Sequence, residues 1–90
     1  MTTGLQVQCD PTPNPNAMKF TLNRKVIEHG SRTFHAGEGA EDPLAQKLLA
    51  IPGVKSLFFL NNFISISRDQ TVPWEKISPK VEEVLRSHFG

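Results

Sequence analysis

The chain has 90 residues, of which 38% are hydrophobic, and its formal net charge at pH 7 is +1. This length suits one small domain over residues 1–90 and leaves no room for a large internal cleft. The near-neutral charge excludes a typical nucleic-acid-binding module, which would be strongly basic, and no apolar run approaches the roughly 20 residues that cross a bilayer.

The N-terminal part of the chain predicts two strands and no targeting segment. Residues 1–4 lack the charged and apolar regions of a signal peptide, so we expect the cytoplasm as location and no membrane partner. Apolar and polar residues alternate over residues 5–9 and again over residues 18–22, which predicts two strands with one apolar face each.

Three prolines alternate with polar residues over residues 11–16, between these two strands. Proline fixes φ and drives the preceding residue into an extended conformation. The segment should therefore be stiff and non-helical, with little entropy to lose when it is held in one shape. Farther on, residues 26–27 suit either a short strand or an apolar plug in a loop, and residues 32–35 suit a third strand with Phe34 pointing inward.

A helix is predicted in the middle of the chain. Asp42 suits its N-cap and Pro43 its first position. The apolar residues that follow recur at helical spacing until residues 52–53, Pro-Gly, end the pattern.

A hairpin is predicted next, with apolar strands over residues 54–60 and 63–66. Residues 61–62 are both asparagine, which tolerates the positive φ of a tight turn. Adjacent residues of a strand face opposite sides, so Phe58 in the core would place Phe59 on the face without helices. We expect Phe63 to share that face, unless the first strands or a loop wrap around the hairpin.

The last helix begins near Trp74 and carries apolar residues at helical spacing. Pro79 interrupts this pattern, so either Ser78 recaps the helix or its first turn is kinked, and we favour the recap. The element order is β-β-(β)-α-β-β-α. It predicts an α+β two-layer sandwich: an antiparallel or mixed sheet of about four to five strands, with two helices on one face.

The sequence offers little catalytic or metal-binding chemistry. It contains no nucleophile elbow, phosphate loop or dinucleotide motif, so we expect no enzymatic activity. Cys9 is the single cysteine and is expected to be buried and inert, with its pKa raised by Asp10. The alternative is direct iron or zinc binding through Cys9, His29 and His35, with carboxylates and across a dimer.

Five motifs, in this order and spacing, resemble the N-terminal domain of Nfu/NifU-like iron–sulfur scaffold proteins. They are PNPNAMKF (13–20), PLA (43–45), IPGVKSLFF (51–59), NFISI (62–66) and WEKISPKV (74–81). The resemblance implies an α+β domain that works in iron–sulfur cluster assembly or delivery. Longer members carry a second domain, whose Cys-x-x-Cys pair holds the cluster between two subunits. These 90 residues contain no such pair, so we expect this chain alone to bind no cofactor and to meet a cluster or iron only through a partner.

The resulting hypothesis is a stand-alone, non-enzymatic adaptor that binds iron–sulfur assembly or client proteins, among them a separate Cys-x-x-Cys scaffold chain. A rigid loop presents polar groups at low ordering cost, and exposed aromatic residues often mark a partner site. The expected partner-binding residues are Pro13, Asn14, Pro15, Asn16, Lys19, Phe59 and Phe63.

Overall fold

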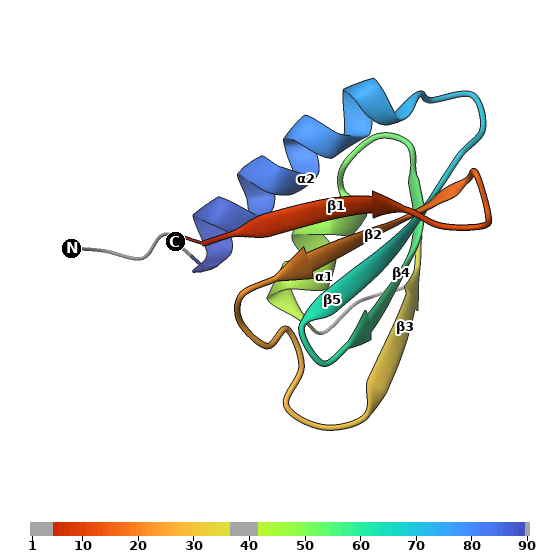
Figure 1. The fold of residues 1–90 in the computed structure, drawn as a ribbon. Coiled ribbons are helices and arrows are strands. Elements are labelled where there is room, and N and C mark those ends of the chain that lie inside the picture. The colour runs from red at the N-terminus through yellow and green to blue at the C-terminus, as the bar shows by residue number, and fades with distance from the viewer. Residues whose placement is uncertain (1–4, 37–41, 90) are drawn as a thin grey trace.

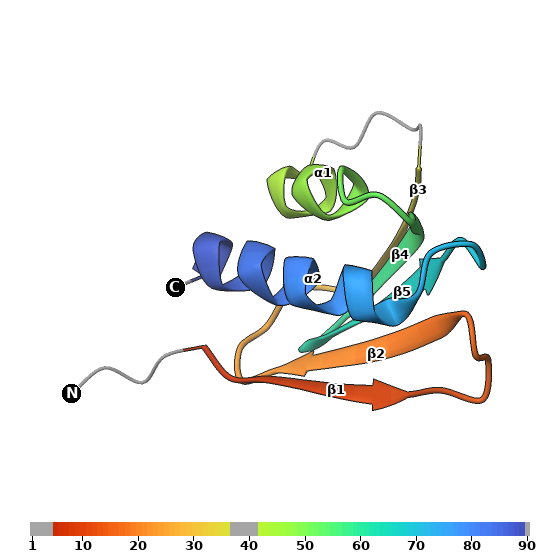
Figure 2. The same cartoon turned by 90° about the horizontal axis from the view of Figure 1, so that it is seen from above.

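The computed structural model describes residues 5–36 and 42–89. The prediction that residues 1–4 form no signal peptide concerns residues outside this described part. The elements are β1 (Val7–Pro11), β2 (Ala17–Leu22), β3 (Ser31–His35), α1 (Pro43–Leu49), β4 (Val54–Leu60), β5 (Phe63–Arg68) and α2 (Trp74–Phe89). The strands form one sheet in the order β1-β2-β5-β4-β3, and all neighbours are antiparallel. Figures 1 and 2 show both helices on one side of this sheet and the other face open. The predicted α+β fold is confirmed.

The core lies between the sheet and the two helices. Phe20, Ile64 and Phe59 are cross-strand neighbours on β2, β5 and β4, and each exposes at most 1% of its surface. Each helix covers this row with a stripe of buried residues: Leu44, Ala45 and Leu48 from α1, and Ile77, Val81 and Leu85 from α2. Within the described residues the buried side chains form one cluster. The expectation of a single domain over residues 1–90 stays a prediction.

Several local predictions are confirmed. The Asp42 carboxylate accepts hydrogen bonds from the backbone N–H groups of Leu44 (2.8 Å) and Ala45 (3.2 Å), as an N-cap should. Asn61 adopts φ 55° in the turn between β4 and β5. Phe34 points inward from β3, and residues 26–27 form a loop plug that packs against the core.

The predicted facing of β4 is wrong. Phe59 is 1% exposed and lies under the helices, as does Leu57, which shares its face of the strand. Phe58 and Phe63 are half-buried on the open face instead. Because residues 57–60 are all apolar, the sequence sets the alternation of this strand but not which alternate residues face the helices.

The predicted recap at Ser78 is also wrong. The helix α2 runs unbroken from Trp74 to Phe89 with Pro79 inside it. Pro79 has no N–H for the carbonyl group of Glu75, which weakens the first turn. That turn carries the fully buried Ile77 and the half-buried Trp74, so unwinding it would expose apolar surface. No helix of the described ranges is long and apolar enough to cross a bilayer.

Candidate partner-binding site

The proline–asparagine loop (residues 12–16) joins β1 to β2 and is held by hydrogen bonds within itself. The Thr12 hydroxyl accepts from the Asn14 N–H (3.1 Å) and donates a shared bond to the carbonyl oxygens of Asn14 (2.9 Å) and Ala17 (3.1 Å). The Asn16 N–H donates to Oδ1 of Asn14 (2.9 Å), which makes an Asx turn. The Asn14 side-chain oxygen therefore shapes the loop itself.

Two further bonds fasten this loop to distant elements. The carbonyl oxygen of Asn16 accepts from the backbone N–H of Arg68 at 2.8 Å, and that of Pro15 accepts from Nε1 of Trp74 at 3.1 Å. Pro13, Asn14 and Pro15 are nevertheless exposed. The loop is thus at the surface and is held by hydrogen bonds to itself and to two distant elements, and the stiffness expected from its prolines stays a prediction.

The open face of the sheet carries an aromatic pair. The rings of Phe58 and Phe63 have centroids 6.3 Å apart, and Nζ of Lys19 lies 4.4 Å from the Phe63 centroid. Beside them Leu60 exposes 37% of its surface. Two of the expected partner-binding residues, Phe63 and Lys19, therefore lie on this face. Phe59 does not, and Phe58 occupies the position that we had predicted for it.

A polar pocket of about 290 Å³ lies between the proline–asparagine loop and the start of β4. Its lining residues are Asn14, Asn16, His35, Lys55, Ser56, Ser67, Arg68 and Gln70. All of them are polar, and none carries a carboxylate. The sequence predicted a role for both asparagines and considered His35 only as a metal ligand. It missed Lys55, Ser56, Ser67 and Arg68, which lie on β4 and β5 about 40 to 55 residues later in the chain.

A β-bulge directs Lys55 toward this pocket. Val54 and Leu57 both lie in the core, although residues three apart in a regular strand face opposite sides. The register shift between Val54 and Ser56 resolves this conflict and leaves Lys55 exposed. Nearby, hydrogen bonds from the backbone and hydroxyl of Thr71 hold the pKa of Asp69 below its ordinary value, and the Lys55 charge acts in the same direction.

Cys9 lies at the edge strand β1, and the expectation that it is buried is wrong, because it is exposed. Its Sγ contacts Sδ of Met18. Partial desolvation raises the pKa of the thiol, with smaller contributions from the negative charges of Glu82 and Asp10, and a hydrogen bond to Ser78 partly opposes them. The environment therefore favours the neutral thiol over the thiolate that metals bind.

The alternative metal ligands do not meet within one chain. Cys9 is on β1 and His35 on β3, the opposite edges of the sheet. At roughly 4.8 Å per strand, four steps separate these strands by about 19 Å. His29 lies in the loop between β2 and β3. Over residues 5–36 and 42–89, no cluster of three or more His, Cys, Asp or Glu side chains could hold a metal ion.

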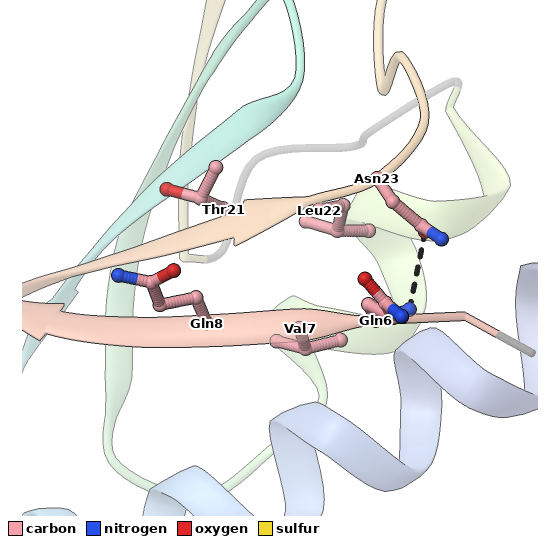
Figure 3. Close-up of a pocket in the computed structure, with 6 residues that line it drawn as sticks. All are labelled: Gln6, Val7, Gln8, Thr21, Leu22 and Asn23. Carbon is pink, nitrogen blue, oxygen red and sulfur yellow. Dashed lines mark hydrogen bonds between the residues drawn. The ribbon is translucent and has the colours of Figure 1, made fainter.

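Two other hollows offer less chemistry. One, of about 330 Å³, is lined by Gln6, Val7, Gln8, Thr21, Leu22 and Asn23. Figure 3 shows Asn23 turned toward Gln6. The backbone N–H of Gln6 donates a hydrogen bond of 3.1 Å to Oδ1 of Asn23. No titratable side chain lines this hollow. The other, of about 240 Å³, lies between the helices beside Lys47, Lys80 and Glu83.

Comparison with known proteins adds a family. Residues 7–90 match the family model described as "Scaffold protein Nfu/NifU N terminal". A NifU-like protein of Schizosaccharomyces pombe is 38% identical over 87 residues, which are 93% of this chain and 34% of that protein. The human "NFU1 iron-sulfur cluster scaffold homolog, mitochondrial" is 33% identical over 86 residues, again 93% of this chain and 34% of that protein. "Conserved virulence factor C" of Staphylococcus haemolyticus is 35% identical over 81 residues, which are 90% of this chain and 22% of that protein.

Solved structures agree with this match. The crystal structure of protein SAV1430 from Staphylococcus aureus has a TM-score of 0.79 at 32% identity, and the similarity covers 89% of this chain and 98% of that one. A NifU-like protein from Saccharomyces cerevisiae has a TM-score of 0.83 at 26% identity, with coverage of 96% and 81%. This chain spans only 22–34% of the curated relatives described above.

Proposed function

Because this chain belongs to the family of Nfu/NifU N-terminal domains, we propose that it is a non-enzymatic adaptor in iron–sulfur cluster assembly or delivery. The observation that carries the proposal is the hydrogen-bonded, exposed proline–asparagine loop at the end of an uncovered sheet face. Such a surface can bind a partner without the loss of conformational entropy that ordering a flexible loop would cost. The family description names a scaffold, and relatives named as iron–sulfur cluster scaffold homologues support the same process.

The docking surface that we propose joins this loop to Lys19, Phe63 and Phe58. Phe58 replaces Phe59, which the helices cover. The partners are iron–sulfur assembly or client proteins, among them a separate chain with a Cys-x-x-Cys pair. The cytoplasm stays the predicted location, although several relatives are named as mitochondrial.

We also propose that the cluster, or iron, is cargo held by the partner. Protein-bound clusters are usually held by four cysteine thiolates, and this chain has one cysteine. The alternative, iron or zinc binding across a dimer through Cys9, His29 and His35, is supported by the exposure of Cys9. The raised pKa of its thiol argues against that alternative.

A capture experiment tests the adaptor role. The purified chain is immobilised and offered purified iron–sulfur assembly proteins, including a Cys-x-x-Cys scaffold chain. Phe63→Ser should reduce capture at least tenfold, whereas Val84→Ser, which also alters a half-buried apolar residue but on the helix side, should leave it unchanged. If the wild-type chain captures none of these proteins, the adaptor role is refuted.

Elemental analysis of chain purified without chelator tests the alternative. Stoichiometric iron or zinc that disappears in Cys9→Ala would support direct metal binding. Metal-free wild-type protein that still captures its partner would support the adaptor.

A further inference from the structure

We propose, building on the adaptor role, that the polar pocket beside the proline–asparagine loop binds a carboxylate of the partner, supplied by an Asp or Glu in an extended acidic segment. The residues that line the pocket carry hydrogen-bond donors: the cations of Lys55 and Arg68, the hydroxyls of Ser56 and Ser67, and the amide of Asn16. None of its lining residues supplies a carboxylate that would repel an anion. Its volume of about 290 Å³ admits one carboxyl side chain with several waters, each of which occupies about 30 Å³.

Arg68 is already held in place. Its Nη1 donates to the carbonyl oxygen of Val72 at 3.0 Å, and its guanidinium lies 5.5 Å from the centroid of the Trp74 ring. Its Nε is buried and, within the described part of the chain, has no hydrogen-bond partner. A buried donor without an acceptor is costly, and guanidinium geometry suits a carboxylate. Arg68 is therefore a positive charge held in a fixed position beside the pocket, and its buried Nε is not exposed to an external group.

Lys55 is free to contribute its charge. The bulge at Val54 and Ser56 turns it outward, and its charge interacts with the carboxylate of Asp69. One oxygen of that carboxylate accepts hydrogen bonds from Thr71 N (2.9 Å) and Oγ1 (2.8 Å). Asp69 is thus held by its own loop, and among the described residues no salt bridge joins its carboxylate to Lys55, so the Lys55 ammonium can still contact an external anion.

The open face explains why the carboxylate should come from a protein. Ser67 and Ser56 are cross-strand neighbours at the pocket, and Ser65 and Phe58 form the next pair toward the aromatic residues. In an extended chain, side chains two residues apart lie on the same side and are about 6.6 Å apart. The distance from the Ser56–Ser67 pair to the Phe58–Ser65 pair along the strands is the same two-residue step. An extended segment with an acid at one position and an apolar residue two positions away can therefore fill the pocket and contact Phe58 together. A free anion would use only the pocket.

An NMR titration of the full chain tests this assignment. The probes are a capped peptide acetyl-Ser-Glu-Ser-Leu-Ser-amide, the same peptide with Gln in place of Glu, and inorganic phosphate. We expect the Glu peptide to shift the backbone amides of Asn16, Ser56 and Ser67, and the Gln peptide to bind about tenfold more weakly, because a charged acceptor is lost. Lys55→Gln should weaken the Glu peptide about tenfold. Lys25→Gln, the same charge change at the opposite end of the sheet, should not.

Three results would overturn the assignment: equal binding of the Glu and Gln peptides, shifts confined to another surface, or phosphate binding at the pocket without peptide binding. Its failure is separable from failure of the adaptor role. Partner capture that survives Lys55→Gln but not Phe63→Ser would refute the carboxylate site alone. A Glu peptide that binds the pocket of a chain capturing no iron–sulfur protein would refute the adaptor role alone.

Discussion

The indole nitrogen of Trp74 donates a hydrogen bond of 3.1 Å to the carbonyl oxygen of Pro15, which lies 59 residues earlier in the chain. Trp74 is the first residue of α2, and Pro15 is in the exposed proline–asparagine loop. The same indole ring lies against the guanidinium of Arg68 in the polar pocket. One side chain thus couples the start of the last helix, the loop and the proposed carboxylate site.

Trp74→Phe should remove this hydrogen bond while keeping an aromatic ring beside Arg68. We expect the free energy of unfolding to fall by about 1 kcal/mol, the net value of one hydrogen bond. Amide hydrogen exchange of Asn16 and Ala17 should accelerate more than that of the core strands. The measurements are urea denaturation and exchange followed by NMR. Unchanged exchange in the loop would mean that the indole does not hold it.

Phe59→Ala should be far more destabilising than Phe63→Ala. Phe59 is 1% exposed and packs on Phe34, with ring centroids 5.1 Å apart, so its truncation leaves a cavity that costs about 3–5 kcal/mol. Phe63 is half-buried on the open face beneath Lys19, and its truncation should cost about 1 kcal/mol. Urea unfolding of the two variants compares them directly. Similar losses would contradict the facing of β4 described above.

Gly53→Ala should destabilise the chain by about 2 kcal/mol or more. Gly53 has φ +99°, and a Cβ there would lie 2.7 Å from Cγ1 of Val72, so backbone strain and a clash act together. Gly30 is the matched control, because its φ is +66° but nothing lies within 4 Å of an added Cβ. Gly30→Ala should therefore cost only about 1 kcal/mol. Thermal unfolding that ranks the two in the opposite order would contradict this explanation.

Cys9 should react slowly with iodoacetamide at pH 8. Its thiol pKa is raised first by desolvation and then by the charges of Glu82 and Asp10, so less thiolate is present than in the unfolded chain. Glu82→Gln removes one of these charges and should speed alkylation. The raised pKa also means that the folded state loses stability as pH rises above the ordinary pKa of a thiol, where the unfolded chain releases its proton first. Mass spectrometry of alkylated protein at several pH values measures the rate, and an unaltered rate in Glu82→Gln would exclude that charge as a cause.

Local chemistry made much of the fold predictable. Every helix start leaves backbone N–H groups unpaired. Asp42 accepts hydrogen bonds from two of them, and Pro43 has no N–H to pair, so these two residues begin a helix. Asn61 turns the chain because it tolerates positive φ. The alternation of residues 18–22 placed Phe20 and Leu22 in the core. The stiffness expected of the proline–asparagine loop also follows from neighbouring residues, since proline restricts φ without any distant contact.

Predictions failed where a distant contact outweighed local preference. Pro79 is kept inside α2 by the packing of Ile77 and by the bond from Trp74 to Pro15. The candidate site likewise draws on residues far apart in sequence, since the strand order brings Lys55 and Arg68 beside Asn16.

The sequence by itself determined most of the helices, strands and turns in this protein, because those properties depend on residues close together along the chain. It left residues 26–27 open and placed a break at Ser78 that the structure does not have. Only the tertiary structure decided which face of β4 the helices cover and that a bulge frees Lys55, because a continuous apolar run is compatible with either facing. It also decided that residues of three strands and two loops surround one polar pocket, because sheet pairing between distant segments brings those residues together.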